Sequence, residues 1–166
     1  LVIVATGRLQ VAGKGPEKCW RALESEALAE AFRVNAIGPA LVAKHFLPLL
    51  PRDRRAVFAA LSARVGSIGD NRLGGWYGYR ASKAALNQMV RTLSVELSRQ
   101  RPQALCVALH PGTVATGLSA PFQAGVAEEK LFTPDFAAER LLRVIDGLEP
   151  HQTGGFFAWD GEAIAW

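Results

Sequence analysis

The stretch Gly74–Val90, GGWYGYRASKAALNQMV, decides the fold, because it leads from a glycine-rich loop into a long helical pattern. Tyr79 and Lys83 open that pattern four residues apart, which places both side chains on one helix face. The helix is predicted to continue to Arg99. An apolar stripe with i, i+4 spacing, expected to face the core, runs along it: Ala85, Met89, Leu93 and Leu97.

Four short apolar runs surround this helix in the sequence. The first three are continuous rather than alternating, which is typical of parallel strands covered on both faces. The fourth is aromatic. The runs are Leu1–Ala5, Ala56–Leu61, Leu105–Leu109 and Gly155–Ala158.

Two further helical patterns alternate with these runs. One extends from about residue 24 to residue 50, and Asn35, Gly38 and Pro39 inside it predict a local bend or break. The other begins at Thr133-Pro134-Asp135, which supplies an N-cap, a helix-start proline and a first-turn acid. The alternation of strands and helices predicts an α/β fold with a mainly parallel sheet.

The composition is that of an ordinary soluble domain. A length of 166 residues suffices for one compact domain, residues 1–166, with its own core. The formal charge is +4, but the densest basic cluster, residues 52–55, is interrupted by Asp53, which argues against nucleic-acid binding. No apolar run approaches the length of a membrane span.

The two cysteines predict neither a metal site nor a disulfide framework. Cys19 and Cys106 lack metal-ligand spacing to another cysteine or histidine. Cys106 lies in an apolar run and is expected to pack as a small hydrophobic residue. A reducing compartment, the cytoplasm, is therefore expected.

The Tyr79–Lys83 pair has the chemistry of a general acid/base. A free tyrosine has a pKa near 10, too high for ready proton exchange at neutral pH. A nearby ammonium favours the phenolate and lowers that pKa, which would bring the phenol closer to the working pH. The alternative is two amphipathic side chains that share a helix face.

Three motifs together resemble the short-chain dehydrogenase/reductase family. Tyr79 and Lys83 match its Y-x-x-x-K, residues 34–38 (VNAIG) match V-N-x-x-G, and residues 110–116 (HPGTVAT) contain P-G-x-V-x-T. Their order and spacing fit the family over essentially the whole chain. The tail 154–161 (GGFFAWDG) and the stretch Ser62–Asn71 are most similar to the C-factor-like branch.

The resemblance implies a Rossmann-like, doubly wound parallel sheet, of which this chain holds the four later strands with flanking helices. It implies an NAD(P)(H)-dependent oxidoreductase that interconverts a carbonyl and an alcohol. The acidic or basic residue that would choose between NAD and NADP is absent from the sequence, so both cofactors stay open, with NADP slightly favoured. Tyr79 would exchange the proton with substrate. Lys83 would lower the pKa of Tyr79 and hydrogen-bond the nicotinamide ribose. Asn35 would hold a water molecule in a proton relay to Lys83.

The resemblance also implies where the cofactor lies. Its nicotinamide end would contact the loop after the third predicted strand. His110, in that loop, is expected to be a packed residue rather than a base. The residues expected to contact the cofactor are Thr6, Gly7, Tyr79, Lys83, Pro111, Gly112, Val114 and Thr116.

The catalytic serine of the family has no direct match. It normally precedes by three residues a glycine that here is Gly66, and that position holds Ala63. Ser62 lies one residue earlier, and a one-residue shift on a strand turns a side chain to the opposite face unless a bulge or turn restores it. We expect Ser62 to polarise the substrate oxygen, with Ser67 as the other candidate.

The glycine-rich phosphate-binding turn of the family is also missing. Residues 1–7, LVIVATG, resemble instead the fourth strand and the N-N-A-G turn after it, with Val4 and Ala5 in place of the two asparagines. Thr6 and Gly7 could approach the cofactor through their backbone. The chain is therefore expected to be the C-terminal part of a longer enzyme, with a bare strand edge at residues 1–5.

These departures leave an alternative open: a non-catalytic binding or signalling protein of the same fold, or an inactive fragment. The resemblance further implies a homodimer or homotetramer through the helices near residues 35–50 and 79–99. The substrate, a small carbonyl or alcohol compound, would be selected by residues 117–131, with Leu118 and Phe122 as possible cavity walls and Lys130 in solvent.

Overall fold

The structure, a computed structural model, describes residues 1–10, 13 and 15–166. Lys14, which the sequence places in a loop, lies outside the described residues. Four parallel strands form one sheet in the order β1-β2-β3-β6. They are β1 (Val2–Val4), β2 (Ala56–Leu61), β3 (Ala104–His110) and β6 (Phe156–Ala158). The four predicted strands are confirmed, with single-residue differences at their ends.

The first long helical pattern is interrupted where the sequence predicts it. α1 (Ser25–Phe32) passes into a π-helical turn, Arg33–Ile37, and then into α2 (Gly38–Phe46). Asn35 lies in the π-helical turn and is fully buried. Single π-helical turns inside α-helices are frequent at functional sites, because they re-aim backbone and side-chain groups.

α3 (Tyr77–Gln100) is the longest helix, and its buried face differs from the predicted stripe. Met89 is exposed, and Ala85 and Leu93 are only partly buried. The buried side chains lie on the face that continues from Tyr79, and many are polar, which is why a search for apolar residues misplaced it. They are Ser82, Lys83, Leu86, Asn87, Val90, Ser94 and Leu97.

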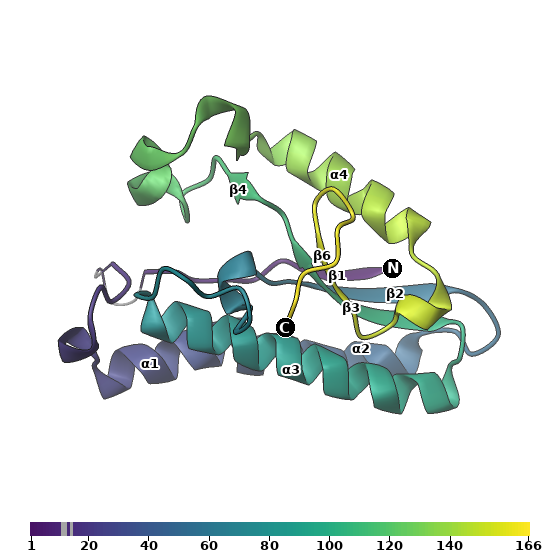
Figure 1. Ribbon diagram of the computed structural model, residues 1–166. Coiled ribbons are helices and arrows are strands. Elements are labelled where there is room, and N and C mark those ends of the chain that lie inside the picture. Colours follow the sequence, from purple (N-terminus) through teal and green to yellow (C-terminus); the bar gives the residue numbers. More distant parts are fainter. Residues whose placement is uncertain (11–12, 14) are drawn as a thin grey trace.

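The sheet separates two helical layers. Figure 1 shows α1, α2 and α3 on one face of the sheet and α4 (Pro134–Gly147) on the other. α4 begins as predicted, since the Thr133 hydroxyl accepts a hydrogen bond from the Phe136 amide at 3.2 Å. Cys106 is buried in the core on the α3 side, which confirms its expected packing.

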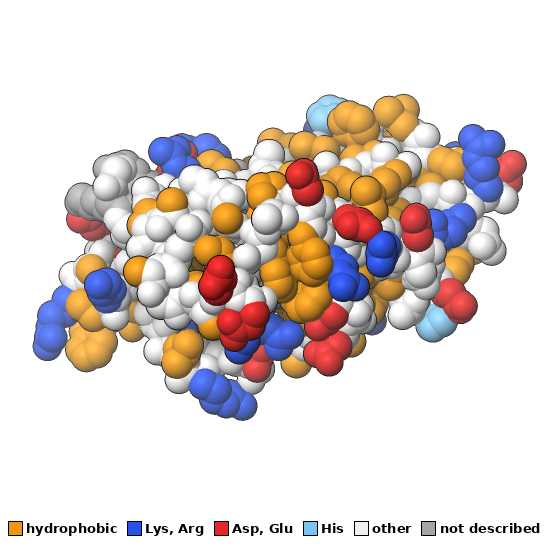
Figure 2. All heavy atoms as spheres, turned by 90° about the horizontal axis from the view of Figure 1, so that it is seen from above, with side chains coloured by type: hydrophobic (Ala, Val, Ile, Leu, Met, Phe, Trp, Pro, Cys, Tyr) orange, Lys and Arg blue, Asp and Glu red, His pale blue; other side chains and the backbone are white. Residues whose placement is uncertain are grey.

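The remaining elements are short. β4 (Thr113–Val114) and β5 (Leu131–Phe132) pair in a second, two-stranded sheet. Among the described residues, none of the helices combines the length and apolarity needed to cross a lipid bilayer. Figure 2 shows basic and acidic side chains interspersed on the face seen from above. The 3-10 helices are Trp20–Ala22, Leu47–Leu49, Arg64–Gly66, Ala120–Gly125, Glu128–Lys130 and Pro150–Gln152.

Candidate active site

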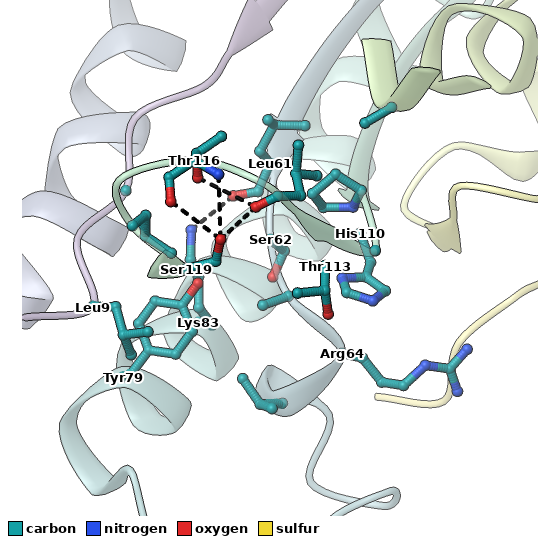
Figure 3. A pocket seen from close by; sticks show the side chains of 18 of the residues that line it. Leu9, Leu61, Ser62, Arg64, Tyr79, Lys83, His110, Thr113, Thr116 and Ser119 are labelled. Carbon is teal, nitrogen blue, oxygen red and sulfur yellow. Dashed lines mark hydrogen bonds between the residues drawn. The ribbon is translucent and has the colours of Figure 1, made fainter. Parts of the chain in front are cut away.

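A cavity of about 930 Å³ opens at the carboxyl ends of β1, β2 and β3. In open parallel sheets this edge is where ligands bind. The cavity brings together nearly all the residues that the sequence analysis selected. Figure 3 shows several of them pointing toward one another. The selected residues that line the cavity are Thr6, Gly7, Ser62, Tyr79, Lys83, Pro111, Gly112, Val114 and Thr116.

Tyr79 and Lys83 project from the first turns of α3 toward the end of β2. The Lys83 Nζ donates a hydrogen bond to the Leu61 carbonyl at 2.7 Å. The same Nζ lies 5.9 Å from the centre of the Tyr79 ring. Lys83 is nearly inaccessible to solvent. Its hydrogen bond to the end of β2 therefore holds a buried ammonium close to the phenol of Tyr79.

Burial sets the direction of the pKa shift at both groups, and the effect expected of Lys83 on the pKa of Tyr79 stays a prediction. Burial raises the pKa of Tyr79 to about 12. Burial also lowers the pKa of Lys83 to about 8, because the charged amine loses its hydration. At neutral pH the phenol therefore keeps its proton and the amine keeps its charge.

Asn35 fastens the segment after β1 to α3. Its Nδ2 donates to the Arg8 carbonyl at 2.8 Å and to the Ser82 hydroxyl at 3.0 Å, and its Oδ1 accepts from the Arg8 amide at 2.7 Å. Asn35 does not itself line the cavity. Gly7 does, however, and a Cβ there would lie 3.5 Å from the Lys83 Nζ. The Asn35 hydrogen bonds thus hold a backbone segment against Lys83.

The two candidate serines have different surroundings. Ser62 lines the cavity, but its hydroxyl donates to the Asn87 Oδ1 at 2.6 Å, toward α3. Ser67 is buried, does not line the cavity, and accepts a hydrogen bond from the Asp70 amide. Ala63 lines the cavity and has no hydroxyl. Of the two serines, only Ser62 is placed where it could contact a ligand.

Gly66 and Gly112 permit close approaches that the site needs. A Cβ at Gly66 would lie 2.7 Å from the Lys83 Cβ, so the turn after β2 contacts α3 directly. Gly112 has a φ of +79°, and a Cβ there would lie 2.5 Å from the Phe132 ring. Phe132 in turn packs against Trp159, with ring centres 4.6 Å apart. These contacts fix the loop after β3 against an aromatic cluster.

Sequence reasoning missed several residues that shape the site. Trp76 has a φ of +53°, unusual for a bulky residue, and lines the cavity with its ring 5.0 Å from that of Phe122. Glu17 accepts a hydrogen bond from the Gly78 amide in the first turn of α3 at 3.1 Å. Ser82 and Asn87 could have been found by counting helical turns from Tyr79, because they share its side of the helix.

The cavity contains the residues expected at the nicotinamide end of a cofactor, whereas the described residues hold no phosphate-binding turn. Thr6 and Gly7 line it from the end of β1, and the loop from Pro111 to Thr116 lines it from the end of β3, on the other side of β2. In the part of the chain that is described, no glycine-rich turn joins a strand directly to a helix N-terminus. Nor does any cluster of histidine, cysteine or acidic residues within that part suit a metal ion.

Known proteins similar to this chain share its family. The profile of the family described as enoyl-(acyl carrier protein) reductase matches residues 8–145. C-signal of Myxococcus xanthus is 38% identical over 169 residues, which cover 98% of this chain and 96% of that protein. The 1-hydroxy-2-glutathionyl-2-methyl-3-butene dehydrogenase of a Rhodococcus species is 36% identical over 144 residues, 87% of this chain and 61% of that enzyme.

Solved structures agree. The NADPH-bound carbonyl reductase from chicken fatty liver superimposes with a TM-score of 0.83 at 28% identity, covering 99% of this chain and 64% of that one. The chain thus spans nearly all of C-signal but less than two thirds of the dehydrogenase and the reductase. By sequence and by fold, the chain belongs to the short-chain dehydrogenase/reductase family, in the branch that includes C-signal.

Proposed function

We propose that this protein is an NAD(P)(H)-dependent oxidoreductase that interconverts a carbonyl and an alcohol, with Tyr79 as the general acid/base. The observation that carries this proposal is the placement of Tyr79 and Lys83 together in the cavity at the strand ends. The similarity to an NADPH-bound carbonyl reductase supports NADP as the cofactor. When bound, the nicotinamide supplies or accepts the hydride.

The pKa of Tyr79 favours the reductive direction. Burial raises that pKa to about 12, so the phenol carries its proton throughout the neutral range. A carbonyl oxygen that gains negative charge during reduction becomes a stronger base than a phenolate and would take this proton. The charged Lys83 beside the ring would then stabilise the phenolate that remains.

Asn35 and Ser62 have supporting roles in this proposal. Asn35 holds the Arg8 backbone, next to Gly7, close to Lys83, and we propose that it also orders a water molecule on the proton route to Lys83. Ser62 would contact the substrate oxygen only if its hydroxyl turns away from Asn87. The variant Ser62→Ala tests that role separately from the role of Tyr79.

The experiment that tests the proposal compares Tyr79→Phe with Tyr77→Phe. The chain contains only these two tyrosines, and Tyr77 does not line the cavity. Oxidation of NADPH is followed with acetophenone as the carbonyl. We expect kcat to fall roughly 10²- to 10⁴-fold in Tyr79→Phe and to stay near the parent value in Tyr77→Phe. Activity retained in Tyr79→Phe would overturn the mechanism, and a parent protein without turnover would favour the binding or signalling alternative.

We also propose that two or four copies associate through α2 and α3. Both helices carry exposed apolar side chains in the described part of the chain: Leu41 is 53% exposed, and Met89 and Val95 are each 43% exposed. Sedimentation velocity over a range of concentrations tests this assembly. A single monomeric species at every concentration would contradict it.

A further inference from the structure

His110 occupies a position in the cavity wall that the proposed mechanism does not use. It is the last residue of β3, and parallel pairing places it beside the end of β2. The neighbouring Leu109 carbonyl accepts a hydrogen bond from the Ser62 amide at 2.7 Å. The imidazole lines the same cavity as Tyr79 (Figure 3). His110 thus lies one strand away from Ala63, where the family has its catalytic hydroxyl.

The two nitrogens of His110 have different surroundings. Nδ1 is buried and has no hydrogen-bond partner among the residues that the structure describes. Nε2 is not among the buried unpartnered atoms, and within the same residues no contact occupies it. The ring lines the cavity, and Nε2 is the nitrogen that remains available to a ligand there.

The surroundings also set the protonation of the ring. The pKa of His110 is lowered to about 4, mainly by burial and also by the Arg64 charge, while Asp160 acts in the opposite direction. A neutral imidazole carries one proton, on one of its two nitrogens. Buried N–H groups without an acceptor are rarer in proteins than unpartnered acceptors. The unpartnered Nδ1 therefore favours the tautomer that carries the proton on Nε2.

The cavity needs such a donor. Position 63 carries no hydroxyl, and the Ser62 hydroxyl already donates a hydrogen bond to the Asn87 Oδ1. An oxygen that gains charge during reduction is stabilised by a fixed donor near it. Tyr79 on α3 supplies one hydrogen-bond donor to the cavity. A second donor could reach the same ligand from the end of β3, which lines the same cavity.

We propose that His110 is a substrate-contacting residue whose Nε2–H donates a hydrogen bond to a carbonyl or hydroxyl oxygen of the bound substrate. The proposal rests on the function proposed above. The ligand class that it implies is a carbonyl or alcohol compound with an oxygen acceptor at the β3 side of the cavity. His110 keeps its proton throughout the reaction, so it differs from Tyr79 in that no proton transfer passes through it.

A first experiment observes the ring directly. In protein labelled with ¹⁵N-histidine, NMR at pH 7 is expected to show His110 neutral and protonated on Nε2, with the exposed His45 and His151 as references. Acetophenone is then added in the presence of NADPH. A shift of the His110 Nε2 signal supports the contact. A proton on Nδ1, or a shifted Trp76 indole signal without a His110 shift, would overturn it. No shift at any cavity residue would instead overturn the proposed function.

A second experiment uses matched variants. Leucine removes the donor in His110→Leu, whereas the amide of His110→Gln keeps a donor at a similar distance from the backbone. We expect His110→Leu to lower kcat/KM for acetophenone roughly tenfold and His110→Gln to recover most of the loss. Equal activity in all three proteins, while Tyr79→Phe is inactive, would overturn the role of His110 and leave the proposed function standing. Turnover by Tyr79→Phe would overturn the proposed function itself.

Discussion

The two faces of the sheet are built from different kinds of side chain. α4 contributes only apolar residues to its buried side: Ala137, Leu141 and Ile145. α3 buries polar groups as well, and the three nearest the site each have a protein partner. Lys83 bonds the Leu61 carbonyl, Asn87 accepts from Ser62, and Ser82 accepts from Asn35.

This difference shows where stability and chemistry are placed in the molecule. Burying apolar surface on the α4 side stabilises the fold in proportion to the area removed from water. Burying polar groups on the α3 side costs free energy that hydrogen bonds only partly offset. The α3 face therefore gives up stability in order to hold an amine, an amide and a hydroxyl near the cavity.

The largest expected effect is on the apolar face. Ile145→Ala leaves a cavity between α4 and the sheet and should lower the free energy of unfolding by about 2–5 kcal/mol. Urea unfolding measures the loss, with the exposed Arg143→Ala as the control. Activity per folded molecule should not change. A loss of activity in folded Ile145→Ala would show that the two faces do not separate stability from chemistry.

The next largest effect is the pH dependence of the free energy of unfolding that is caused by burial of Lys83. Burial lowers the pKa of Lys83 from 10.5 to about 8, so between these values the unfolded chain binds more protons than the folded one. The cost of burying the charge is thus present in full below pH 8 and disappears as the pH rises to about 10.5. It amounts to about 3 kcal/mol.

Urea unfolding of the parent protein and of Lys83→Met at several pH values isolates this contribution. The stability of the parent should rise relative to that of Lys83→Met between about pH 8 and pH 10. If the stability of both proteins changed with pH in the same way, the buried Lys83 amine would not destabilise the folded protein as proposed.

A smaller effect concerns Asn87. Asn87→Leu removes the acceptor for the buried Ser62 hydroxyl and should destabilise the protein by about 1–3 kcal/mol. Adding Ser62→Ala removes the unpaired donor, so the double variant should be more stable than the sum of the two single changes predicts. Strict additivity would contradict the pairing. The measurement is the double-mutant cycle by urea unfolding.

The smallest effect is at the start of α4. Thr133→Ala removes the side-chain cap of the helix and should cost about 1 kcal/mol. Thr133→Ser keeps the hydroxyl and serves as the control in thermal unfolding. An equal loss in both variants would mean that the methyl group rather than the cap stabilises this end.

The sequence alone was sufficient for the parts of the molecule with regular periodicity. Continuous apolar runs predicted the strands, and Thr133-Pro134-Asp135 predicted the start of α4. The buried face of α3 could not be found by hydrophobicity, because Ser82, Lys83 and Asn87 are polar and buried together. Their burial depends on partners that lie far away in the chain.

For the candidate active site, the sequence predicts which residues come together but not how their side chains are arranged. Motif spacing selected Tyr79, Lys83 and the loop after Pro111, and the structure brings them into one cavity. Spacing could not show that burial raises the pKa of Tyr79, or that the Ser62 hydroxyl turns toward Asn87. It also predicted that His110 packs rather than acts as a base, and it could not show that the ring lines the cavity with a buried, unpartnered Nδ1.

The sheet order also has a kinetic consequence. Each strand pairs with a partner far along the chain, as Val2 does with Phe58, Ala56 with Ala104, and Ala108 with Phe156. Such distant pairings are reached late, because a long loop must close before any contact offsets its entropy. α3 depends on local contacts and can form far earlier. The helix that carries Tyr79 and Lys83 is therefore expected to exist before the sheet that buries their side chains, and the active site is among the last parts of the protein to be completed.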